Sequence, residues 1–167
     1  MDFGILIARI VLGVLMAGHG TQKLFGWFGG YGLAGTSGFF ENLGFRPGRL
    51  FATAASAGEV VSGLLIALGL FGPIGPAILL AIMIVAGVTV HWQHGVFATS
   101  NGIELPLLYA TGAVLFALTG FGRFSLDALL GLGSLWTPAI VGSTLAAGVV
   151  AGVINLTLRR VPVTANR

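Results

Sequence analysis

The sequence predicts an all-α protein embedded in a lipid bilayer, and three observations support this fold class. Hydrophobic residues make up 56% of the chain and charged residues only 8%, with a mean hydropathy of +0.99, whereas soluble domains carry roughly 25% charged residues. Between residues 4 and 158, apolar runs are interrupted only by short polar segments. The runs are continuous and lack the polar-apolar alternation of membrane β-strands. We therefore expect a bundle of transmembrane helices.

Five of the apolar runs have roughly the 17 to 25 residues that a helix needs to cross the hydrocarbon layer. We predict transmembrane helices over residues 3–23, 50–71, 76–97, 104–120 and 136–158. The first run resembles a secretory signal in position, but Arg9 interrupts it, and it has neither a basic start nor an A-x-A cleavage site. We therefore expect it to be retained as the first helix.

The connecting segments support these boundaries. FGPIGP at 71–76 predicts a tight turn, with Pro76 suited to the first turn of a helix, and residues 98–102 form another polar break. Segment 122–135 is too short to span and is expected to form an interfacial helix or a linker. The longest connection, 24–49, is rich in glycine and aromatic residues, which is typical either of an aromatic belt at the membrane interface or of a lid over the bundle. Its aromatic side chains include Trp27, Phe28, Tyr31, Phe39 and Phe40.

The basic residues predict an orientation in the cell membrane. With five spans, the 24–49 connection and the C-terminus share one side, which holds Lys23, Arg46, Arg49, Arg159, Arg160 and Arg167. The other side holds only Arg9 and Arg123. Because cytoplasmic loops carry an excess of Lys and Arg, we expect a cytoplasmic C-terminus and an N-terminus outside.

The composition also excludes several classes of function. The net charge of +3 comes from basic residues near helix ends rather than from one run, so no nucleic-acid surface follows. Because the chain has no Cys, it cannot exchange disulfides, hold an iron–sulfur cluster or build a thiolate metal site. Any redox role must use a bound cofactor or a partner.

The last span carries Gly148-x-x-x-Gly152 and Gly142-x-x-x-Ala146. Such spacings of small residues let helix backbones approach closely in lipid. They predict close helix packing, either within the bundle or between protomers of a homo-oligomer.

Ionisable residues of four predicted spans fall in the same half of the membrane. Alternating helix directions bring the end of the first span, the start of the second, the end of the third and the start of the fourth to one side. These positions are occupied by His19, Lys23, Glu59, His91 and Glu104, with Gln22 and Tyr109 close by along their helices.

Glu59 is the most informative of these residues. A carboxylate at that depth costs at least ~2.5 kcal/mol unless it pairs, takes up a proton or meets water, so we expect it to face the bundle interior and to pair with Lys23 or a histidine. Small residues surround it at Ser56, Gly58, Ser62 and Gly63. The pair could serve chemistry, or it could only lock the helix register.

The histidines leave further alternatives open. His19 and His91 could ligate haem or a metal from opposing helices, but their spacing is not diagnostic, and we predict no metal site. Hydrogen bonding to Glu59 or Glu104 is the favoured interpretation, and a histidine beside a carboxylate can relay protons. We interpret Trp92 and His94 mainly as interface anchors.

Several motifs together resemble the DoxX family of small bacterial membrane proteins. They are H-G-x-Q-K-L-F-G-W-F-G-G at 19–30, G-F-F-E-N-L-G at 38–44, A-x-x-G-E ending at Glu59, T-V-H-x-x-x-G-x-F at 89–97, G-x-E-x-P-L-L at 102–108 and G-x-G-R-F-S-L-D at 120–127. The resemblance implies a four-helix membrane core over 1–121. An interfacial linker at 122–135, an additional helix at 136–158 and a basic tail at 159–167 would follow that core. The motif residues that the resemblance marks as candidate functional positions in this chain are His19, Gln22, Lys23, Glu59, His91 and Glu104.

The resemblance also implies membrane redox systems, because some members are subunits of a thiosulfate:quinone oxidoreductase and others join an oxidative-stress complex with a superoxide dismutase and a sulfurtransferase. Our first hypothesis is therefore a subunit of a quinone-linked or oxidative-stress system. In it, Glu59, His19 and His91 exchange protons, and side chains around them hold the quinone. These binding candidates are Gln22, Lys23, Trp27, Trp92, Glu104 and Tyr109.

Two further hypotheses belong to other classes of protein. The chain could be a non-enzymatic adaptor that holds a redox or stress-response enzyme at the membrane, with its internal charges serving only helix pairing. A transporter for a small solute is the third alternative, because buried charges also mark transport paths. Against it, the sequence has no pair of interrupted spans.

Overall fold

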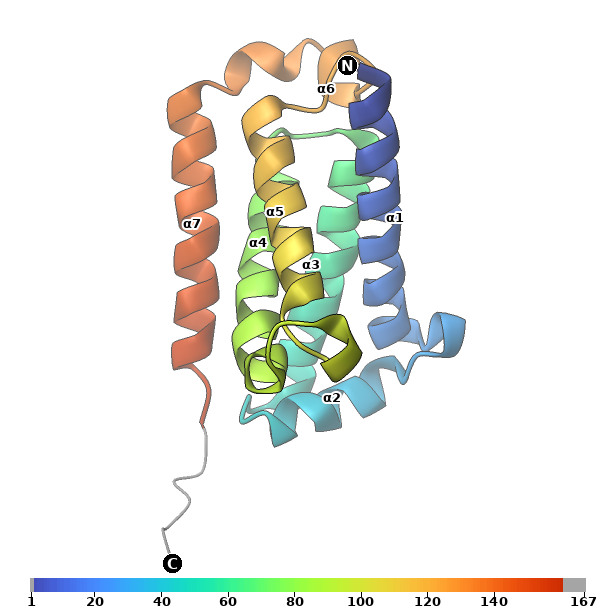
Figure 1. The fold of residues 1–167 in the computed structure, drawn as a ribbon, viewed down its shortest axis with the longest axis vertical. Coiled ribbons are helices and arrows are strands. Elements are labelled where there is room, and N and C mark those ends of the chain that lie inside the picture. The colour runs from blue at the N-terminus through green and yellow to red at the C-terminus, as the bar shows by residue number, and fades with distance from the viewer. Residues whose placement is uncertain (1, 161–167) are drawn as a thin grey trace, which may run out of the picture.

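Residues 2–160 are described by the computed structural model, and within this range five long helices run side by side in alternating directions (Figure 1). They are α1 (Asp2–Phe25), α3 (Gly48–Leu68), α4 (Ile74–Ala86), α5 (Glu104–Thr119) and α7 (Pro138–Thr157). Shorter helical elements connect them, namely η1 (Trp27–Gly29), α2 (Gly32–Asn42), η2 (Gly87–His91), η3 (Trp92–His94), η4 (Ala98–Ser100), α6 (Leu126–Leu129) and η5 (Leu132–Leu135). The predicted all-α membrane fold is confirmed.

Helix α5 is shorter than the four helices that could cross a membrane. Four helices of the described chain are long and apolar enough to cross a membrane, namely Asp2–Phe25, Gly48–Leu68, Ile74–His94 and Pro138–Thr157. Helix α5 has 16 residues, about 24 Å at 1.5 Å per residue, against a hydrocarbon layer of about 30 Å. The predicted run 104–120 is therefore helical up to Thr119 and ends before Gly120 (φ 73°), but it is shorter than the four helices that are long enough to cross a membrane.

Helices α1 and α3 are in backbone contact because small residues line their interface. A Cβ atom added to Gly13 would lie 2.4 Å from the carbonyl oxygen of Gly63, and one added to Gly20 would lie 2.6 Å from that of Ser56. Neither position leaves room for a side chain. This close approach fixes the relative rotation of the two helices that carry Lys23 and Glu59.

Helix α7 packs on α4 through the small residues that the sequence singled out. A Cβ atom at Gly148 would lie 2.5 Å from the carbonyl oxygen of Ala77, and one at Gly152 would lie 3.1 Å from that of Ala81. The sequence left open whether these small residues pack within the bundle or between protomers, and the structure shows packing within the bundle. No atom lies within 4 Å of a Cβ built at Gly142, and a homo-oligomer stays a prediction.

At the α6 end, a buried acid and a buried base hold the connections together. Asp127 accepts hydrogen bonds from the backbone N–H groups of Phe71 (2.8 Å) and Gly72 (2.7 Å) and from the Trp136 indole (2.8 Å). Arg9 is buried and donates to the carbonyl oxygens of Ala67 and Phe124. Segment 122–135 thus ties the α3–α4 turn to the start of α7.

At the opposite end, the long aromatic connection contains a helix that the sequence did not predict. Helix α2 crosses beneath the bundle (Figure 1), and the Thr36 hydroxyl donates to the carbonyl oxygen of Lys23 at 3.1 Å. The end of α7 joins the same region, because the Arg160 N–H donates to the Gly44 carbonyl at 2.8 Å. Residues 161–167 of the predicted basic tail, including Arg167, lie outside the described residues.

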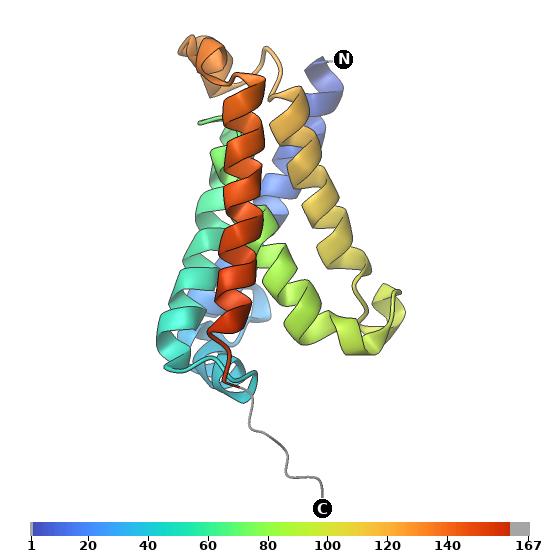
Figure 2. The same ribbon diagram turned by 90° about the vertical axis from the view of Figure 1, so that its left-hand side faces the viewer.

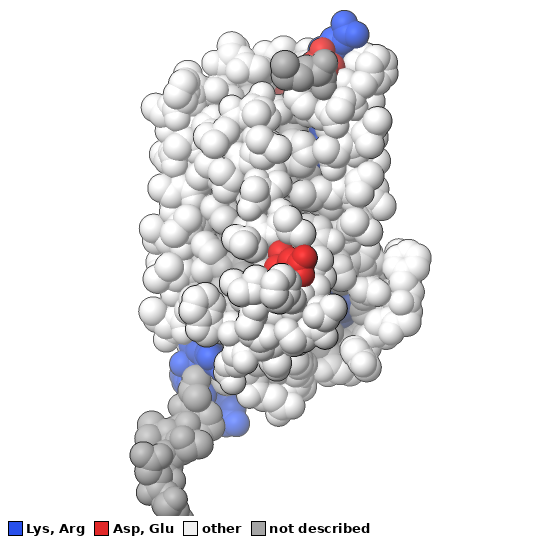
Figure 3. Space-filling view, in the orientation of Figure 1, with Lys and Arg blue, Asp and Glu red and all other residues white. Residues whose placement is uncertain are grey.

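The distribution of charge agrees with a bundle that stands across a membrane. On the face seen in Figure 3, most of the blue Lys and Arg surface lies at the two ends, and the surface between them is white apart from one red acidic patch near the middle and small blue areas. The buried core lies among the long helices and consists of Met16, Ile66, Leu79, Met83, Ala113, Phe116 and Phe121.

Candidate functional site

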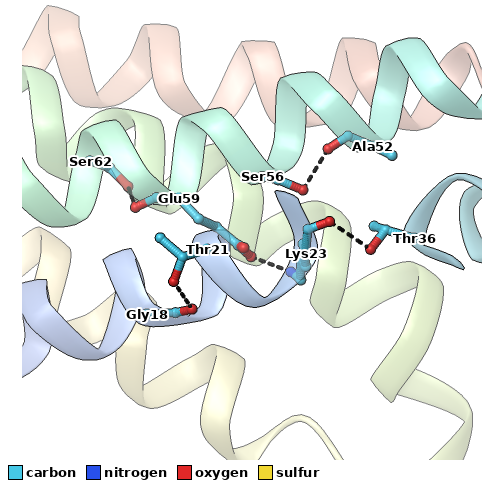
Figure 4. A network of polar contacts seen from close by, with 8 residues as sticks. All are labelled: Gly18, Thr21, Lys23, Thr36, Ala52, Ser56, Glu59 and Ser62. Atoms are coloured by element: carbon cyan, nitrogen blue, oxygen red, sulfur yellow. Dashed lines mark hydrogen bonds and ion pairs between the residues drawn. The ribbon is translucent and has the colours of Figure 1, made fainter. Parts of the chain in front are cut away.

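An ion pair between a partly exposed lysine and a buried glutamate joins α1 to α3. Lys23 lies in the last turn of α1, and its ammonium group contacts Glu59 Oε1 in the middle of α3 (Figure 4). Glu59 is 2% exposed, whereas 37% of the Lys23 side chain is exposed. The carboxylate therefore faces the bundle interior, as its depth in the sequence predicts, and its partner is Lys23.

The second oxygen of this carboxylate is not satisfied. Glu59 Oε2 is buried and has no hydrogen-bond partner among the described residues. The two nearest hydroxyls along α3 are engaged elsewhere, because Ser56 donates to the Ala52 carbonyl (2.6 Å) and Ser62 to the Glu59 carbonyl (3.3 Å) (Figure 4). A buried acceptor without a donor costs about 1–3 kcal/mol. This oxygen is thus suited to a donor from outside the described chain.

The ion pair lies at the wall of a large cavity. The cavity has a volume of about 860 Å³ and is partly open, and its walls come from α2, α3, the α4–η2 segment and α7. It lies toward the end of the bundle where α3 and α4 diverge on either side of α7 (Figure 2). The walls are mainly small or aromatic, and the residues that matter below are Lys23, Phe39, Phe51, Ala55, Glu59, Ala86, Ala151 and Asn155. A volume of this size is typical of small-molecule sites.

An irregular helix turn forms part of the cavity wall. Helix α4 continues into the π-helical turn η2, in which the Thr89 hydroxyl donates to the Val85 carbonyl at 2.8 Å. Both residues line the cavity. Insertions of this kind inside helices occur frequently at functional sites.

The comparisons with known proteins identify the family. A model of the DoxX family matches residues 4–92, which is just over half of the chain. The chain belongs to the DoxX family. No curated protein and no solved structure gave a significant match. The matched region of this DoxX protein contains Lys23 and Glu59 but ends before α5 and α7, so Ala151 and Asn155 of the cavity wall lie outside it.

Most of the other predicted site residues lie elsewhere in the DoxX bundle. His91 Nδ1 is 2.8 Å from the Asn101 carbonyl oxygen, and Glu104 Oε2 accepts from the Ala98 N–H at 2.7 Å. Both interactions organise the connection between η2 and α5. His19 is exposed and lies edge-on to Tyr109, with 6.3 Å between the ring centroids.

The sequence places His19, Lys23, Glu59, His91 and Glu104 in one half of the membrane, and of these residues only Lys23 and Glu59 line the cavity. Sequence position gives the height of a side chain along a helix. It does not give the direction in which that side chain points, and the change from α-helix to π-helix at Gly87 alters this direction for His91.

The remaining predicted binding residues also lie outside the cavity lining. Gln22 donates to the Phe28 carbonyl at 3.3 Å, and Trp27 stacks near Phe25 with ring centroids 5.1 Å apart. Trp92 is 68% exposed, as an interface anchor would be. Residues that sequence reasoning missed include Ala151 and Asn155 on α7. The sequence signal that could have pointed to this wall is the polar side chain of Asn155 within the apolar run 136–158.

Proposed function

We propose that this DoxX protein is a membrane subunit of a quinone-linked or oxidative-stress redox system, and that the cavity beside Lys23 and Glu59 binds the quinone ring. The observation that supports the proposal is the combination of an apolar cavity of about 860 Å³ with one ion pair at its wall. An apolar site with a few placed polar groups is the usual design for a lipophilic ligand.

The residues present fit such a ligand. Small side chains such as Ala55, Ala86 and Ala151 leave space for a flat ring, and Phe39 and Phe51 supply aromatic surface. The volume also accommodates part of an apolar tail. The buried Oε2 of Glu59, which lacks a partner among the described residues, gives the site one strong acceptor.

Quinones supply electron transfer that is coupled to protons. In this site the Lys23 ammonium is placed to donate to a ring oxygen, and the Glu59 carboxylate to take up or return a proton there. Both residues of the pair line the cavity, whose walls are mainly apolar, and 37% of the Lys23 side chain is exposed. His19 and His91 receive no role at the ring, because neither lines the cavity.

Filling the cavity tests the proposal. The change Ala151→Phe places a ring in the cavity wall from α7, and we expect it to weaken binding of a decyl-substituted benzoquinone by about tenfold, since bulky additions to a packed site cost about 1–3 kcal/mol. The neighbouring Val150→Phe is the matched control, because Val150 is exposed and does not line the cavity. Calorimetric titration of the purified protein in lipid nanodiscs measures both. No binding by the unmodified protein would overturn the proposal.

The orientation in the cell membrane is part of the same proposal. The end that holds α2 also holds Lys23, Arg46, Arg49, Arg159 and Arg160, and we place it in the cytoplasm. Because the chain has no Cys, a single introduced cysteine is the only residue that a maleimide can label. In intact cells an impermeant maleimide should label Ser134→Cys, on the α6 side, but not Thr99→Cys, in η4. The reverse labelling would contradict the orientation.

An adaptor for a partner redox enzyme is the second candidate function. The aromatic segment before α2 favours it, because Trp27, Phe28 and Tyr31 are all exposed at the proposed cytoplasmic end. Large exposed aromatic groups are typical of protein interfaces as well as of membrane belts. Recovery of a soluble enzyme with the intact protein, lost in Phe28→Ser but kept in Ala151→Phe, would support the adaptor.

A further inference from the structure

The ion pair of Lys23 and Glu59 presents two different hydrogen-bonding groups to the cavity. Glu59 carries an acceptor, Oε2, that has no partner among the described residues. Lys23 uses one of its three ammonium protons on Glu59 Oε1, and its side chain is partly exposed. The pair thus places an acceptor and donors at one point of a mainly apolar wall.

From this arrangement we infer that the site distinguishes the two redox forms of its ligand and binds the hydroxyl-bearing hydroquinone more tightly than the quinone. The inference rests on the proposed function. A quinone carries only carbonyl acceptors at the ring, so it can pair with Lys23 but leaves Oε2 of Glu59 without a donor. A hydroquinone hydroxyl donates to the carboxylate and accepts from the ammonium, so it satisfies both groups.

The geometry of Glu59 allows this contact. Oε2 is buried in the ligand-free arrangement, but the terminal torsion of a glutamate is soft and nearly two-fold. A rotation about that bond moves both oxygens together and brings Oε2 toward the cavity that Glu59 already lines, while the long and partly exposed Lys23 side chain follows Oε1. No movement of α1 or α3 is needed, so their close backbone contact at Gly13 and Gly63 is preserved.

Three ligands test the inference with the unmodified protein. They are a decyl-substituted benzoquinone, its hydroquinone and the di-O-methyl ether of that hydroquinone, titrated under anaerobic conditions against the protein in nanodiscs. We expect the hydroquinone to bind at least about tenfold more tightly than the quinone, because only the hydroquinone satisfies the buried acceptor. The ether lacks the donor and should bind no better than the quinone.

A substitution at Glu59 sharpens the test. In Glu59→Gln, Lys23 holds the amide oxygen and the NH₂ group faces the cavity, which presents a donor where the carboxylate presented an acceptor. The preference for hydroquinone should fall below about threefold or reverse, since the site then suits a carbonyl. Glu41→Gln is the control, because Glu41 bonds the Gly48 N–H at 3.3 Å and does not line the cavity. It should keep the full preference.

The outcomes separate the inference from the proposed function. If the quinone and the hydroquinone bind equally, or if the ether binds as tightly as the hydroquinone, the inference is overturned and quinone binding stands. If Glu59→Gln keeps the full preference, the selecting group is not Glu59 and the inference is also overturned. If none of the three ligands binds, both the inference and the proposed function fail.

Discussion

Two buried carboxylates, one in the middle of α3 and one at the α6 end of the bundle, have very different hydrogen-bond partners. Asp127, 6% exposed, accepts three hydrogen bonds, two from the backbone of the α3–α4 turn and one from Trp136. Glu59 is even more deeply buried, yet only one of its oxygens has a partner among the described residues. Burial of an acid is thus no guide to its role.

The difference follows from what surrounds each acid. Asp127 faces a turn whose N–H groups at Phe71 and Gly72 are not used by a helix, so donors are at hand. Glu59 lies within α3, where the helix consumes the backbone N–H groups and the neighbouring serine hydroxyls donate to carbonyls. Asp127 therefore stabilises the connections at its end of the bundle. Glu59 keeps one oxygen without a donor among the described residues, beside a cavity.

The largest effect should come from removing the satisfied acid. Asp127→Ala leaves three donors without an acceptor, and we expect it to lower the free energy of unfolding by about 3 kcal/mol or more. Thermal unfolding of the purified protein measures this loss. Below the unfolding temperature, benzoquinone binding should be unchanged, because the Glu59 cavity contains no residue of the α6 segment. An unaltered thermal midpoint would contradict the structural role given to Asp127.

A smaller effect is expected where α7 meets α4. A side chain at Gly148 collides with the backbone of Ala77, and Gly148→Leu should therefore cost about 1–3 kcal/mol and displace a wall of the cavity. Binding of benzoquinone should weaken together with stability. This result would show that the cavity beside Glu59 depends on the packing of α7 against α4.

The control for this change lies on the same helix. Nothing lies within 4 Å of a Cβ atom at Gly142, so Gly142→Leu should leave the stability and ligand binding of the monomer almost unchanged. A loss of oligomers in Gly142→Leu, seen by light scattering, would instead reveal a protomer interface at that position. Equal effects of both substitutions on stability would refute the packing role of Gly148.

The smallest effect should come from an exposed acid. Asp2 pairs with Arg123 at 3.5 Å, with 68% of the Arg123 side chain exposed. Solvent screens such a pair, so Arg123→Ala should change the free energy of unfolding by less than about 0.5 kcal/mol. Chemical denaturation in the same detergent, compared directly with Asp127→Ala, checks this value. A loss comparable to that of Asp127→Ala would mean that exposure is a poor guide to these pairs.

The amino-acid composition predicts the long helices of the fold, and the position of Glu59 within an apolar run predicts the ion pair of the candidate site. The apolar runs identify the long helices, and the cost of an isolated charge predicts that Glu59 must find a partner. The sequence did not predict α2, because its glycines and aromatic residues carry no clear polar-apolar period. It also missed the wall supplied by Ala151 and Asn155, since nothing in one sequence tells which earlier helix a later span will face.

The position of α7 has a consequence for biosynthesis. Its Ala151 and Asn155 complete a chamber whose other sides come from α1 to η2, and its end bonds back to Gly44. During translation, the other walls of this cavity are therefore made before α7, and the cavity has its full set of walls only once α7 packs against α4.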